Sequence, residues 1–113
     1  MIDAAVIRDI LSVYAKHGWT LRRVLLSDKS SKSIGVETKI LFADKSVQIS
    51  DIDAVWFSRK TKNGGTAWEI RHLSSAPFAL VVFINEESVK LNDVLSGAEN
   101  RLRETVGKRI TGH

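Results

Sequence analysis

Apolar residues near the start of the chain recur with the spacing of an α-helix. Two adjacent rows of apolar side chains share one face of this helix, namely Val6, Ile10 and Val13, and Ile7, Leu11 and Tyr14. Asp3 is suited to cap the start of the helix, and Gly18 can adopt the left-handed conformation that ends it. The pattern therefore predicts a helix at about residues 4–17, whose wide apolar stripe indicates packing against a sheet.

Extended structure is expected after this helix. Residues 19–26 have the composition of a strand, in which successive side chains point to opposite faces. Arg22 and Arg23 are therefore predicted to lie on opposite faces and not to form one patch. The next expected elements are a polar loop at residues 27–33, a strand at residues 36–43 and a short extended piece at residues 47–49.

A β-hairpin is the clearest local signal, because residues 54–60 and 66–73 flank a turn with an Asn63-Gly64 step. A two-residue loop centred on this step places Phe57 opposite Ile70, and centring it on Gly64-Gly65 changes the partners but not the faces. Either loop puts four large apolar side chains on one face, namely Val55, Phe57, Trp68 and Ile70. A three-residue loop would place Phe57 on the same face as Arg71, so the pattern favours a two-residue loop.

Residues 78–84 are apolar on both faces, which is typical of a strand at the centre of a sheet. A second helix is expected to begin at residues 85–88, with Asn92 as an alternative N-cap. Its apolar row consists of Leu91, Leu95, Ala98, Leu102 and Val106. The elements together predict a single α+β domain over residues 1–113. This two-layer sandwich has an N-terminal helix, a four- to five-stranded mostly antiparallel sheet, and a C-terminal helix.

If both helices cover one face of the sheet, the other face, which bears Trp56, has nothing in the chain to cover it. The expected solution is a homodimer through this outer face. The competing arrangement places one helix on each face of the sheet and gives a monomer. The residues expected to contribute are Trp56, Ala67 and Leu73, beside Ala54 and with Ala79, Val81 or Phe83 from the neighbouring strand.

Composition narrows the functional classes. The 113 residues include no cysteine, which excludes disulfides, thiolate metal sites and cysteine nucleophiles, and favours a reducing cytoplasm. The longest apolar run, Pro77 to Ile84, is far shorter than the ~20 residues of a membrane span. No residues in the order of a secretory signal open the chain, so the expected protein is cytoplasmic and has no membrane contact.

The chain carries 17 Lys and Arg against 13 Asp and Glu, a net charge of +4. Neither half contains the run of like charges that marks a nucleic-acid-binding tail. Nucleic-acid binding is therefore an alternative function rather than the leading one. The residues best placed for it are Arg59, Lys60 and Lys62 at the hairpin tip, helped by Arg71.

Motifs for catalysis are weak. No GxSxG or phosphate-loop motif is present, and the three histidines lack the spacing of a metal site. Asp51 and Asp53 precede the hairpin, and Glu69-x-Arg71 lies on its second strand, which faintly resembles the acid arrangement of metal-dependent nucleases. Those enzymes have lysine at the position that Arg71 occupies here, and arginine stays protonated and cannot serve as a base. The pattern therefore favours a cross-strand charge network of Lys60, Glu69 and Arg71 over a nuclease site.

The sequence thus assigns no catalytic, cofactor-binding or metal-ligating residue. The leading hypothesis is a small non-enzymatic binding or protein-interaction module that self-associates through the outer sheet face. Nucleic-acid binding is second and a metal-dependent nuclease third.

Overall fold

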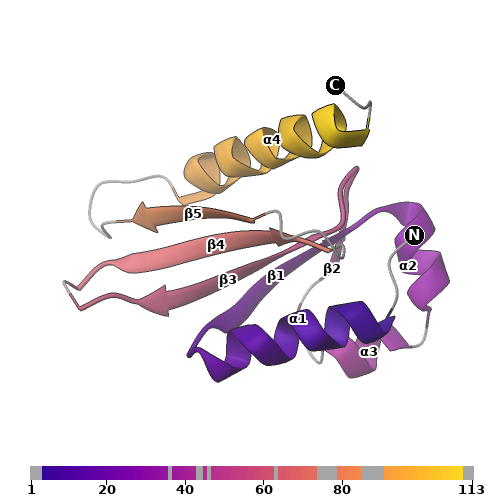
Figure 1. Ribbon diagram of the computed structural model, residues 1–113, viewed down its shortest axis with the longest axis horizontal. Helices are drawn as coiled ribbons and strands as arrows, with labels where there is room; N and C mark the ends of the chain where they lie inside the picture. The colour runs from indigo at the N-terminus through magenta and orange to yellow at the C-terminus, as the bar shows by residue number, and fades with distance from the viewer. Residues whose placement is uncertain are drawn as a thin grey trace.

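The computed structural model describes residues 4–35, 37–42, 45, 47–62, 64–73, 79–84 and 91–110. In chain order, its elements are α1 (Ala4–Lys16), β1 (Thr20–Leu26), α2 (Asp28–Ile34), α3 (Glu37–Phe42), β2 (Val47–Ile49), β3 (Ala54–Lys60), β4 (Thr66–His72), β5 (Ala79–Ile84) and α4 (Leu91–Ile110). Figure 1 shows α4 on one side of the sheet and α1 and α3 on the other. No helix in these ranges is long and apolar enough to cross a membrane.

The five strands form one mixed sheet in the order β2-β1-β3-β4-β5. β1 and β2 are parallel, and all other neighbours are antiparallel. The α+β class is thus confirmed, with an N-terminal helix, a five-stranded sheet and a C-terminal helix. The prediction that residues 78–84 form the centre of the sheet is wrong, because β5 lies at its edge. Leu80 and Val82 on one side of β5 pack against the core of the α4 face, while Val81 and Phe83 on the other side are exposed.

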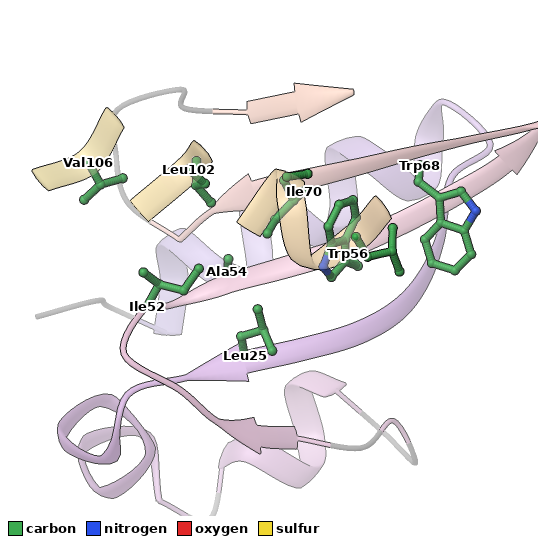
Figure 2. Close-up of a cluster of buried hydrophobic side chains, with 10 residues drawn as sticks. Leu25, Ile52, Ala54, Trp56, Trp68, Ile70, Leu102 and Val106 are labelled. Atoms are coloured by element: carbon green, nitrogen blue, oxygen red, sulfur yellow. The ribbon is translucent and has the colours of Figure 1, made fainter. Parts of the chain in front are cut away.

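Helices cover both faces of the sheet, so the expectation that both helices pack on one face is wrong, and the competing arrangement with helices on both faces is the one observed. The reason lies in β3, where Trp56 and Phe57 are successive, large and both buried, and one helix covers only one of them. The core of the α4 face contains Leu25, Ile52, Ala54, Trp56, Trp68 and Ile70 with Leu95, Ala98, Leu102 and Val106 of α4 (Figure 2). The core of the α1 face contains Ile7, Ile10, Val24, Leu26, Ile34, Phe42, Val55, Phe57 and Leu73.

The hairpin is confirmed, but its predicted register is wrong. Lys60 pairs with Thr66, which leaves five residues between the two strands. The Thr61 N–H donates to the Gly65 carbonyl at 2.9 Å, and Gly64 has a φ of +85°. Trp56 therefore lies opposite Ile70 on the α4 face. The predicted two-residue loop places Phe57 opposite Ile70 instead. The pairing is thus shifted by one residue from the predicted register, and such a shift moves every side chain of one strand to the other face relative to its partners. Asn63 lies outside the described residues.

A β-bulge in β1 corrects the prediction for its two arginines. Leu21 pairs with Phe57, but the next pair joins Arg23 to Trp56, so Arg22 is an extra residue on β1. Arg23 shares the α4 face with Trp56. The guanidinium carbon of Arg22 lies 5.6 Å from the ring centroid of Trp68, which belongs to the same core. Both arginines therefore lie on the α4 face.

Two segments predicted as a polar loop and a strand are the short helices α2 and α3. Ser27 caps α2 by accepting a hydrogen bond from the Ser30 N–H at 3.1 Å, and Lys32 pairs with Asp28 at 3.0 Å. In α3, Ile40 is 77% exposed whereas Phe42 is 1% exposed. Six residues are too few for periodicity to distinguish a strand from a helix, so the apparent alternation at residues 36–43 was misleading.

Candidate interaction surface

The three residues predicted to form a dimer interface are inside the protein. Trp56 is fully buried, and Ala67 and Leu73 are 4% and 3% exposed. The Trp56 indole N–H donates to Oε2 of Glu99 in α4 at 2.7 Å, so α4 covers the ring and satisfies its polar atom. Leu73 belongs to the core of the α1 face, on the other side of the sheet from Trp56. The expectation that these three residues lie on an uncovered outer face is therefore wrong, and in this structure they offer no surface to a second copy.

An apolar surface is exposed instead on β5. Leu80 and Val82 pack against the core of the α4 face. The alternate residues Val81 and Phe83 are 45% and 75% exposed. They share the α1 face with Glu69 of β4, which pairs with Val81. We call this surface the open face, and define it by Glu69 and Arg71 of β4 and Val81 and Phe83 of β5.

Tyr14 of α1 marks the point where helical cover of this face ends. Its ring stacks on Phe57 of β3 at a centroid distance of 4.0 Å, and its hydroxyl donates to a carboxylate oxygen of Glu69 on β4. Burial raises the pKa of Tyr14, and the hydrogen bond and negative charge of Glu69 raise it further, while Arg71 acts in the opposite direction. The helix therefore covers β1 and β3, reaches β4 through one polar contact, and leaves β5 open.

The edge of β5 also lacks the features that usually protect a sheet edge. All six of its residues are apolar, in the sequence Ala-Leu-Val-Val-Phe-Ile, and among the described strands β4 is the one that pairs with it. Edge strands of monomeric proteins are commonly short, charged or interrupted by proline. The opposite edge follows that rule, because β2 has only three residues and carries the exposed Gln48. The two edges of the sheet thus differ in their capacity to pair with another strand.

Of the four basic residues named for nucleic-acid binding, three lie at or next to the hairpin tip and Arg71 lies away from it. The Arg59 guanidinium lies 4.8 Å from the ring centroid of Trp19 and donates to the His17 carbonyl at 3.0 Å. Lys60 and Lys62 are exposed at the hairpin tip. Arg71 lies five residues along β4 from Thr66, about 17 Å away at the rise of a strand. Nucleic-acid contact by this tip stays a prediction.

The three acids of the nuclease hypothesis are engaged in separate places. Asp51 pairs with Arg103 of α4 at 2.6 Å, and that hydrogen bond lowers the Asp51 pKa. Asp53 accepts hydrogen bonds from the Ser27 N–H at 2.7 Å and the Ser30 hydroxyl at 2.8 Å, which fixes the start of α2. Glu69 accepts from Tyr14. Within the described ranges, no three His, Asp or Glu side chains form a group that could hold a metal ion.

Comparison with other proteins gives no independent assignment. The chain matches no protein-family model, and comparisons with curated proteins and with solved structures return no similar protein. Val81 and Phe83 were expected at a surface, but beside Trp56 rather than on the opposite face. The four central residues of β5 are equally apolar, so their pattern held no signal for which pair a helix would cover.

Proposed function

We propose that this protein is a non-enzymatic interaction module that self-associates by pairing β5 with β5 of a second copy. The observation that carries the proposal is the exposure of Val81 and Phe83 on an unprotected, entirely apolar edge strand. The free backbone groups of such an edge can extend the sheet by hydrogen bonding, and its side chains add apolar contact.

A second copy fits this edge for reasons of symmetry. Antiparallel pairing of β5 with itself forms a closed two-fold dimer, in which the same residues contribute from both chains. The resulting ten-stranded sheet ends in β2 on both sides, and β2 has only three residues. In this dimer both β5 edges are paired, and the two remaining edges of the sheet are formed by the short strand β2. Pairing about an axis perpendicular to the sheet also brings Val81 and Phe83 of both copies onto one surface.

The size of the surface sets the expected affinity. A six-residue strand is about 20 Å long. Stable protein complexes bury about 800 Å² on each partner, and one strand pair with two exposed apolar side chains falls below that area. We therefore expect a dissociation constant in the micromolar range, with monomer and dimer in exchange.

The test is light scattering and sedimentation of Phe83→Lys and wild-type protein from about 1 µM to about 1 mM. The wild-type mass is expected to rise towards that of a dimer, and the variant is expected to remain monomeric because the change puts a charge within the proposed apolar contact. Ile40→Lys is the matched control, since Ile40 is 77% exposed in α3, a helix that packs against α1 and α2, and the change adds the same charge.

Two outcomes would contradict the proposal. A wild-type protein that stays monomeric at the highest concentration would remove self-association altogether. A dimer that survives Phe83→Lys but dissociates in Ile40→Lys would place the interface on α3 instead of β5. Because Phe83 is 75% exposed, the variant is expected to keep the wild-type circular dichroism spectrum.

A further inference from the structure

The α4 face contains a polar hollow beside its apolar core. It has a volume of about 540 Å³ and is lined by Arg22 and Arg23 of β1, Gln48 of β2, and Asn92, Ser96 and Glu99 of α4. Its size lies in the range of small-molecule sites, ~300–1,000 Å³. All six lining side chains carry polar groups, so the hollow suits a polar ligand.

The β1 bulge is what gives this hollow two guanidinium groups. In a regular strand, Arg22 would point to the α1 face and only Arg23 would remain here. The extra residue turns both towards α4. Arg22 is stacked over Trp68, and Arg23 donates to the Asn92 side-chain oxygen at 2.8 Å. Each arginine is thus held by a neutral partner, which does not offset its positive charge.

The charge balance within the hollow favours an anion. Glu99 is its one carboxylate among the lining residues, and that group already accepts the Trp56 indole N–H. Neither Arg22 nor Arg23 takes part in the ion pairs that join Lys32 to Asp28 and Arg103 to Asp51. Arg103, on the same helix as Glu99, has an acidic partner, whereas the two arginines of the hollow have none among these residues.

We propose that this hollow binds a small molecule through an oxyanion, a phosphate or a carboxylate group held by Arg22 and Arg23. Guanidinium groups bind both anions through paired hydrogen bonds. Ser96 and the amide groups of Gln48 and Asn92 supply further hydrogen-bonding groups. Glu99 on the α4 wall is an acceptor, so it suits a hydroxyl or ammonium group at the other end of the ligand. The site lies at β1 and β2, and does not depend on pairing of β5.

The three tryptophans make the test selective. The indole N–H of Trp56 is bonded to Glu99, and Trp68 lies beneath Arg22, so both report on the hollow. Trp19 contacts Arg59 and packs on the α1 face, so it is an internal control. The probes are glycerol 3-phosphate, glycerate and glycerol, which share a polyol and differ in the charged group. We expect the indole NMR signals of Trp56 and Trp68 to shift with at least one of the two anions and not with glycerol.

Variants then locate the binding. The double variant Arg22→Gln/Arg23→Gln is expected to weaken binding at least about tenfold, because charge-assisted hydrogen bonds to the anion are lost. Arg101→Gln, at an exposed position of α4 outside the hollow, should stay within about twofold of wild type. Binding of either anion supports the proposal, and the tighter one identifies the preferred group. The absence of any shift, equal shifts at Trp19, or unchanged affinity of the double variant would each overturn it.

Discussion

The two faces of the sheet are covered to different extents. On the α4 face, one helix packs over β3, β4 and β5 and buries Trp56, Trp68 and Ile70. On the α1 face, three shorter helices lie near β1 and β3, and cover stops at the contact between Tyr14 and Glu69. The same strand β5 is therefore packed on one side and exposed on the other.

This difference separates two kinds of surface on one sheet. On the α4 face, the side chains of β3 and β4 pack into an apolar core, whereas β1 contributes two arginines to a polar hollow at its bulge. On the α1 face, β1 and β3 contribute to a buried apolar core, whereas the side chains of β5 are apolar but exposed, and nothing among the described residues buries Phe83. A polar margin suits a small charged ligand, whereas an apolar margin suits another protein surface.

The largest expected effect tests whether both faces are covered at β3. Trp56→Ala and Phe57→Ala should each lower the free energy of unfolding by about 3–5 kcal/mol, because both rings are buried in separate cores. Phe83→Ala should change it by no more than about 0.5 kcal/mol, since that ring is 75% exposed. Denaturant melts at low micromolar concentration measure all three. A large loss in Phe83→Ala would show that the open face is covered in the monomer.

The sequence predicted well those elements whose signal is local. The helical rows at residues 4–17 and the row from Leu91 to Val106 correspond to α1 and α4, and the hairpin flanks correspond to β3 and β4. The two helices are long enough for the spacing of their apolar residues to identify them. The two strands are identified by the Asn-Gly turn between them, which has strong conformational preferences. The short helices α2 and α3 were less accessible from the sequence. The segment that forms α2 is made largely of serine, aspartate and lysine, which also favour turns.

Features that depend on pairing between distant segments were not accessible. Whether Arg22 and Arg23 share a face is decided by a bulge opposite Phe57 and Trp56, more than 30 residues away along the chain. The prediction of a two-residue loop depends on the assumption that only one face of β3 is buried. That assumption does not hold, because helices bury both faces of β3. As a result, Val81 and Phe83 were placed on the same face as Trp56, and the arginine-lined hollow was missed.

An intermediate effect is expected at the margin of the α1 face, where Tyr14 reaches β4. Tyr14→Phe removes the donor to Glu69 and should cost about 1–2 kcal/mol, since a partly buried carboxylate loses its partner. Folding raises the Tyr14 pKa above its ordinary value near 10, so this contribution is fully present below pH 10 and is lost as the pH rises further. Denaturant melts between about pH 8 and pH 11 should therefore show wild type and variant converging at the alkaline end. A constant difference across that range would assign the loss to packing alone.

The smallest effect is expected at the margin of the α4 face, where Arg103 of α4 pairs with Asp51 after β2. Asp51 is 71% exposed, so water and salt screen the pair, and Asp51→Asn should cost less than about 1 kcal/mol despite the 2.6 Å contact. Arg103 lowers the Asp51 pKa in the folded state. The contribution is therefore present above the ordinary aspartate pKa of about 4 and is lost as the pH falls below it. Melts at pH 7 in low and high salt, repeated near pH 3, should show the difference between wild type and variant shrinking with added salt and with acid.

Asp53→Ala is the neighbouring comparison, and should cost more, because Asp53 is half-buried and accepts from both Ser27 and Ser30. Equal losses in the two variants would mean that the Asp51 contact is as protected from solvent as the cap of α2, and that α4 is held to the sheet by more than its apolar row.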